Sequence, residues 1–181
     1  MDKQTKTNQR EGIYVRLDQY DDIFSDFDMR PYSDRALSVD FLDEIKRAVS
    51  GKDGGDIELI LHVPENKRDE SREATIKERL GAHFLRHYQL LQKEKRDVLK
   101  TGIIMVLLGI ICMIIATLVH FGDSSREAFL SFLIVFLDPV AVFLLWEGMD
   151  QIIFNSKNIN PELGFYHKMT DSHEWVQFRA Y

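Results

Sequence analysis

The sequence predicts a membrane α-helical hairpin of two transmembrane helices joined to a small cytosolic α/β domain with a two- or three-stranded sheet. The hairpin is predicted because residues 101–121 and 128–154 are both long and apolar, with only the polar joint 122–127 between them. Each segment is close to the ~20 residues needed to cross a hydrocarbon core of about 30 Å. The small domain is predicted by a strand, helix and strand pattern within residues 12–69. A hairpin buried inside a soluble domain is the alternative, but the remaining chain is too short to cover both helices on all sides.

The balance of charge changes ahead of the first span. Residues 11–70 carry 8 Lys and Arg against 16 Asp and Glu, whereas residues 71–100 carry 8 against 4. A basic segment directly before an apolar run is typical of a juxtamembrane region. The whole chain has a net charge of −6, and its acidic first half offers no basic stripe to neutralise phosphates. Nucleic acid is therefore not an expected partner.

The first half of the chain reads as short elements in order. Residues 1–11 are polar and lack periodicity, so we expect a disordered tail and no signal peptide. Alternating apolar and polar residues predict a strand over 13–17. The acidic stretch 18–34, with its interleaved aromatic residues, predicts an irregular loop that packs onto the domain. A helix over 39–49 and a strand over 57–63 follow, and this order favours a parallel pair of strands.

Residues 70–100 predict an amphipathic juxtamembrane helix. No Pro and no pair of glycines separates this helix from the first span, so we expect one continuous helix. Four basic residues precede the first span, whereas the joint offers Arg126 alone. The positive-inside rule then places both termini in the cytoplasm and the joint outside an inner (cell) membrane. The basic residues are Lys93, Lys95, Arg96 and Lys100.

The segment 155–181 predicts a cytosolic tail. It opens with a loop, because Asn155, Asn158, Asn160 and Pro161 disfavour a helix. It closes with an aromatic and β-branched run over 175–181, which is either a third strand of the sheet or a frayed end.

The run LDQYDDIFSDFDMRPYSDRALSVDFLDEI, followed by a strand, a long helix and a two-span hairpin, resembles a family of small prokaryotic membrane proteins. The resemblance is strongest over 24–37 and extends over most of the chain. That family carries no assigned activity, so the resemblance implies the same architecture and no catalytic residues.

One acid stands within the second span. Asp138 lies about ten residues from either end of the most apolar part of this span, 128–146, near the middle of the bilayer. A charge at that depth costs ~2.5–3.5 kcal/mol on insertion scales, so an intramembrane acid is a functional candidate. Pro139 follows directly and removes a backbone donor, which predicts a kink and a local polar pocket. Asp138 either joins helices or caps the kink, conducts ions or protons, or contacts a partner membrane protein.

Small residues form a predicted helix-packing stripe along both spans. At helical spacing they share one face of the first span, and Ser131 shares the face of Asp138 on the second. Small residues allow helices in lipid to approach closely. In an antiparallel hairpin, Asp138 should then lie level with Ile111 and Cys112. The stripe comprises Gly102, Gly109, Cys112, Ala116 and Ser131, and His120 falls in the same sector of the first span.

Metal chemistry has only a weak signal. His83 and His87 are spaced i, i+4 and can present two imidazoles to one metal ion, with His62 as a third ligand. A zincin motif needs Glu directly after the first His, where Phe84 stands instead. Phosphate-binding loops and nucleophile elbows are also missing from the sequence. We therefore expect no cofactor and no enzymatic activity.

Together these features predict an integral, non-enzymatic membrane protein. Its cytosolic domain is expected to mediate homo-oligomerisation or to recruit another membrane protein. The alternative is an oligomeric ion or proton channel, or a transport component, that uses Asp138.

Overall fold

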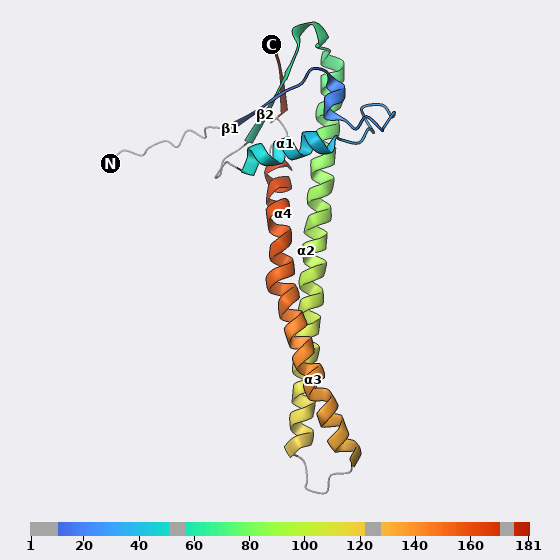
Figure 1. The fold of residues 1–181 in the computed structure, drawn as a ribbon, viewed down its shortest axis with the longest axis vertical. Coiled ribbons are helices and arrows are strands. Elements are labelled where there is room, and N and C mark those ends of the chain that lie inside the picture. The colour runs from blue at the N-terminus through green and yellow to red at the C-terminus, as the bar shows by residue number, and fades with distance from the viewer. Residues whose placement is uncertain (1–10, 51–56, 122–127, 171–175) are drawn as a thin grey trace, which may run out of the picture. The chain divides into compact units, whose positions relative to one another are not determined.

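The computed structural model describes residues 11–50, 57–121, 128–170 and 176–181 (Figure 1). The chain divides into two compact units, one formed by residues 1–89 with 162–181 and the other by residues 90–161. Residues 1–10 of the expected tail over 1–11, and the joint 122–127, lie outside the described residues, whereas Glu11 begins a strand.

The first unit contains a parallel sheet of three strands in the order β1-β2-β3. Strand β1 (Glu11–Arg16) pairs with β2 (Ile57–Val63), and β2 pairs with β3 (Val176–Ala180). The expected parallel pair is therefore confirmed. The question left open at the C-terminus is settled in favour of a third strand. A backbone bond from the N–H of Tyr181 to the carbonyl of Val63, 3.2 Å long, extends that pairing.

Helices pack their apolar residues into the core of this unit. Helix α1 (Val39–Ser50) buries Phe41, Ile45 and Val49 at helical spacing, which places them on one face. Helix α2 (Glu70–Phe121) begins at Asp69, whose carboxylate accepts the backbone N–H of Arg72 at 3.2 Å. Its first turns bury Ile76, Leu80 and Phe84. Helix α2 is unbroken over 52 residues, so the expected continuous helix is confirmed.

The acidic stretch 18–34 is irregular, as expected. Some of its apolar residues are buried and others are exposed. Tyr20 and Ile23, from a short 3₁₀ turn (Tyr20–Ile23), are buried, and Phe24 pairs with Leu37 in an isolated bridge. Phe27 from the same stretch is fully exposed.

A buried carboxylate links this stretch to the start of α2. Glu73, only 5% exposed, accepts the hydroxyl of Tyr20 at 2.8 Å and the guanidinium of Arg68 at 2.9 and 3.0 Å. Burial alone would raise the pKa of Glu73, but these hydrogen bonds hold the pKa below its usual value. The carboxylate is thus stabilised in its charged form inside the core.

The segment after Phe154 is helical, so the expected loop is wrong. Helix α3 (Ala128–Asp150) continues through a π-helical turn (Gln151–Asn155) into α4 (Ser156–Thr170). Pro161 lies inside α4 despite its missing N–H. The physical reason is tertiary packing, because α4 buries Phe165, Tyr166 and Met169 in the first unit and this outweighs local propensity. The helix also passes through Pro139 in α3.

In the second unit, α2 and α3 approach each other through glycines. A Cβ added to Gly148 would lie 2.8 Å from the carbonyl oxygen of Gly102, and one added to Gly109 would lie 3.0 Å from that of Ala141. Ala116 and Ala141 are buried as well. Backbones this close leave no space for larger side chains.

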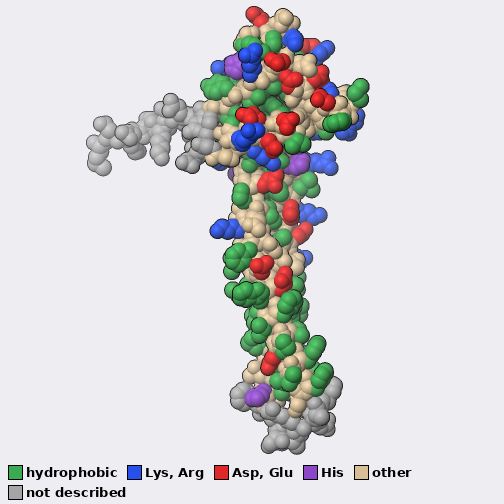
Figure 2. Space-filling view, in the orientation of Figure 1, with side chains coloured by type: hydrophobic (Ala, Val, Ile, Leu, Met, Phe, Trp, Pro, Cys, Tyr) green, Lys and Arg blue, Asp and Glu red, His purple; other side chains and the backbone are tan. Residues whose placement is uncertain are grey.

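The outer surfaces of the helical hairpin are apolar. Within the described residues, two helices are long and apolar enough to cross a membrane, and only 17% and 11% of their most apolar stretches are buried. The core helix of a soluble protein would be mostly buried. Figure 2 shows hydrophobic side chains along these helices. The exposed apolar residues include Leu107, Leu118, Phe132, Val135 and Phe143.

We predict that Gly148→Leu destabilises the protein by about 1–3 kcal/mol, because the new side chain clashes with the backbone of Gly102. Thermal unfolding in detergent measures the loss. Gly164→Ala is the control, since a Cβ there meets nothing within 4 Å. The control should be unchanged or stabilised by up to ~1 kcal/mol. Equal stability of Gly148→Leu and wild type would contradict the close approach.

We also predict that Glu73→Gln lowers the stability by about 1.5–3 kcal/mol, because the hydrogen bonds from Arg68 then reach a neutral amide. The shift of the unfolding midpoint is the measurement. Glu65→Gln, an exposed acid, is the control and should leave that midpoint unchanged. An equal midpoint for Glu73→Gln and wild type would show that the ion pair adds nothing.

Candidate functional site

Asp138 is an exposed residue of α3 that lines a cavity of about 260 Å³ in the second unit. Ile134 of α3 lies one turn earlier, and α2 contributes the other walls, namely Ala116, Thr117 and His120. The hydroxyl of Thr117 donates to the carbonyl of Met113 at 2.8 Å. The cavity therefore brings one carboxyl and one imidazole together from two apolar helices.

The position of Asp138 along α2 differs from the expectation. The sequence places it level with Ile111 and Cys112, but the structure groups it with Ala116 and Thr117, about one turn nearer the joint. The contact of Gly109 with Ala141 and Leu145 sets this register. Symmetry about the joint, the basis of the expectation, does not determine how far one helix slides along the other.

A second recess borders Asp138 on the outer surface of α3. It has a volume of about 480 Å³ and is lined by Pro139, Val142, Phe143 and Trp146. The last three side chains are exposed. Asp138 thus stands between a polar cavity and an open apolar surface. This surface offers no basic side chain, because neither span contains Lys or Arg.

The small residues predicted as a packing stripe differ in their exposure to solvent. Gly102, Gly109 and Ala116 are buried, and Cys112 is half-buried. Ser131 is exposed. The glycines bring α2 and α3 together and so set the position of the cavity.

His120 is the residue of the cavity that sequence reasoning did not connect with Asp138. Helical spacing does place His120 on the same face of the first span as Gly109 and Ala116, which was the available signal. Its pairing with a residue 18 positions later depends on the register of the hairpin. A carboxyl and an imidazole in one cavity can exchange a proton or bind a cation together.

His83 and His87 lie in the first unit, outside this site. Their ring centroids are 4.3 Å apart, and Tyr166 of α4 stacks on His87 at 5.2 Å. His62 instead lies on β2 beside Tyr14, at 6.1 Å. Within the described ranges, no three His, Cys, Asp or Glu side chains are placed to hold a metal ion.

The environment of His83 favours its neutral form. Its Nε2 atom is buried and has no hydrogen-bond partner in the described part of the chain. Burial, followed by the charges of His87 and Arg79, lowers the pKa of His83 to about 4. Lys46 of α1 and Arg86 of α2 act in the same direction. Burial also lowers the pKa of His87, whereas Glu162 of α4 opposes that shift.

We predict that acid destabilises the first unit through His83. The unfolded chain takes up a proton near pH 6.5, whereas folded His83 stays neutral down to about pH 4. Stability should therefore fall as the pH decreases through this interval. The unfolding midpoint measured between pH 7 and 5 should fall less in His83→Leu than in wild type. His167→Leu, at an exposed position of α4, is the control. Equal slopes for wild type and His83→Leu would contradict the assignment.

Comparison with protein-family models, with curated proteins and with solved structures finds no match to this chain. The resemblance to a family of small membrane proteins therefore stays a prediction, and function is argued from the site alone.

Proposed function

We propose that this chain is a non-enzymatic integral membrane protein whose helical hairpin assembles with further membrane-spanning helices through the surface around Asp138. The observation that carries the proposal is the exposed carboxyl of Asp138 on an otherwise apolar hairpin. In this arrangement, residues 101–121 and 128–154 cross an inner membrane and both termini are cytoplasmic. The exposed apolar surfaces and the basic residues before the first span support it.

The cost of a carboxyl group in lipid argues for a covering partner. Ionisable side chains inside membranes almost always face the interior of a bundle or a water-filled cavity. Two helices enclose little interior, and Asp138 lines an open recess with Val142 and Trp146. A second copy, or another membrane protein, would cover this recess and supply hydrogen-bond partners in place of lipid.

The three-stranded unit supports an assembly role rather than catalysis. Its buried polar side chains, such as Glu73 and Tyr20, are hydrogen-bonded to each other and to Arg68. These groups stabilise the fold and leave no activated nucleophile among them. We assign this unit to the cytosol, where it would contact other copies or recruit a partner.

Proton or ion passage is the second candidate function. It is favoured by the cavity that Asp138 shares with His120 and Thr117. A carboxyl and an imidazole at this position resemble the proton relays of transporters. Reconstituted vesicles would then show a proton or cation flux that Asp138→Asn abolishes. An identical flux in Asp138→Asn would remove Asp138 as the conducting group.

We predict that the protein is oligomeric in nanodiscs and that Asp138→Leu shifts it towards a smaller assembly. Leucine removes the hydrogen bonds that Asp138 makes across the contact, whereas Asp138→Asn keeps part of them and should have a weaker effect. Native mass spectrometry measures the change. Glu147→Gln, at the far end of α3 and bonded to Gln151, is the matched control.

A monomeric wild-type protein would contradict assembly. An unchanged mass in Asp138→Leu would contradict the role of Asp138, because association would then depend on another surface.

A further inference from the structure

The loop between Phe24 and Leu37 displays two large apolar side chains to solvent. Phe27 is 99% exposed and Met29 is 92% exposed. Single exposed apolar residues are common on protein surfaces, but two at the tip of one loop form a potential anchor. We call Phe27 and Met29 the apolar knob.

Hydrogen bonds hold the loop that carries the knob. Asp28, between the two knob residues, accepts the guanidinium of Arg30 at 2.7 Å and the backbone N–H of Ala36 at 2.8 Å. Phe24 and Leu37 close the base of the loop as a bridge. The guanidinium of Arg35 stacks above the ring of Phe24 at 5.9 Å. The knob is therefore presented by a fixed loop, which reduces the entropy lost on binding.

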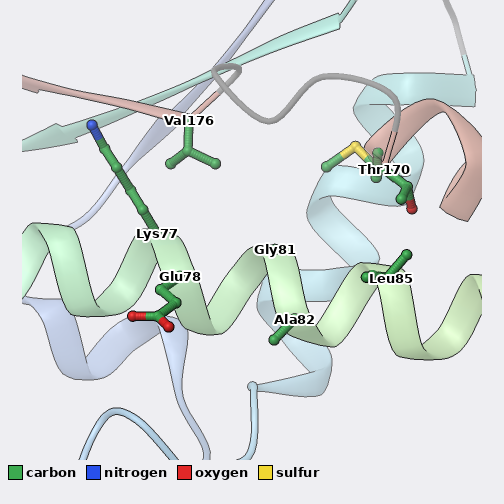
Figure 3. A pocket seen from close by; sticks show the side chains of 8 residues that line it. Lys77, Glu78, Gly81, Ala82, Leu85, Thr170 and Val176 are labelled. Atoms are coloured by element: carbon green, nitrogen blue, oxygen red, sulfur yellow. The ribbon is translucent and has the colours of Figure 1, made fainter.

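A cavity on α2 offers a matching acceptor. It has a volume of about 340 Å³ and lies between α2, the end of α4 and β3 (Figure 3). Gly81 faces this space, since a Cβ added there meets nothing within 4 Å. Gly in a helix interior costs ~1 kcal/mol relative to Ala, and among the described residues no neighbouring atom requires it here. The mostly apolar walls include Leu85, Met169 and Val176.

The knob and the cavity lie on different faces of α2. The loop contacts α2 through Arg79, whose Nε donates to the carbonyl of Arg35 at 3.1 Å. Lys77 and Gly81, two residues before and after Arg79, line the cavity. Positions two apart on a helix point about 200° away from each other. One copy therefore cannot insert its knob into its own cavity.

We propose that the apolar knob of one copy of this chain docks in the Gly81 cavity of a second copy. Charge also matches across the contact. Asp26 precedes the knob and has no hydrogen bond or ion pair in the described part of the chain, while Lys77 lines the cavity. The contact joins two different patches, so it either closes as a two-fold dimer with both knobs docked or continues from copy to copy and closes into a ring if the rotation permits.

The contact is tested with full-length protein in nanodiscs by cysteine cross-linking. In a Cys112→Ser background, one preparation carries Asp26→Cys and the other carries Lys77→Cys. We expect the mixture to form disulfide-linked heterodimers under mild oxidation, because the two positions face each other across the contact. Val39→Cys replaces Asp26→Cys in the control, as Val39 is 70% exposed on α1.

Two further substitutions test whether the cross-link depends on docking of the knob or arises from chance proximity of the two cysteines. Phe27→Asp added to the first preparation, or Gly81→Leu added to the second, should lower the yield of heterodimer at least about tenfold. Both changes are compatible with the fold of the described residues, because Phe27 is exposed and a Cβ added to Gly81 meets none of their atoms within 4 Å. A yield no higher than that of the Val39→Cys control would overturn the proposal. A yield unaffected by both Phe27→Asp and Gly81→Leu would overturn it as well.

This contact goes beyond the assembly proposed for the hairpin, and each of the two proposals can be contradicted without the other. Cross-linking between positions 26 and 77 reports on the cytosolic contact alone. The mass of the assembly that the Asp138→Leu variant forms reports on the hairpin contact alone.

Discussion

The close approach of α2 and α3 at Gly102, Gly109 and Gly148 is the constraint on which the hairpin depends. At these positions the backbone of one helix occupies the space that a side chain would need on the other. Such contacts fix the sliding register of the two helices, because a shift of one turn would bring larger side chains against the backbone. The register in turn determines that Asp138 shares a cavity with Ala116, Thr117 and His120 rather than with Cys112.

The local elements of this fold could be predicted from sequence, whereas contacts between distant segments could not. Alternation and helical periodicity correctly predict β1, α1, β2 and the parallel pairing of β1 with β2. The third strand could only be left open, because β3 pairs with a strand more than a hundred residues earlier. The helix through Pro161 was missed because Phe165 and Tyr166 stabilise it through tertiary packing. In the candidate site, Asp138 was identified by its chemistry and His120 was not, since only the register brings them together.

Two carboxylates in this chain show how environment separates a structural acid from a functional candidate. Glu73 is buried, yet Tyr20 and Arg68 satisfy it with three hydrogen bonds inside one unit. Its free energy of burial is compensated within the chain, so no partner is required. Asp138 instead lines an open recess with Pro139 and Trp146, on a span without basic residues. A group whose charge the described residues of the chain do not compensate is the one that a partner, water or a proton must satisfy.

Two modest contacts on one chain can produce a stable assembly when both form between the same copies. Confinement to a membrane already restricts how copies meet, and a first contact raises the effective concentration for the second. The two proposed contacts, one centred on Asp138 and one formed by Phe27 and Met29, would therefore need little affinity individually. Weak individual contacts also explain why neither surface must resemble a large obligate interface, such as those that bury 2,000 Å² or more. Under this arrangement the loss of either contact reduces the affinity of the whole assembly by more than that contact contributes alone.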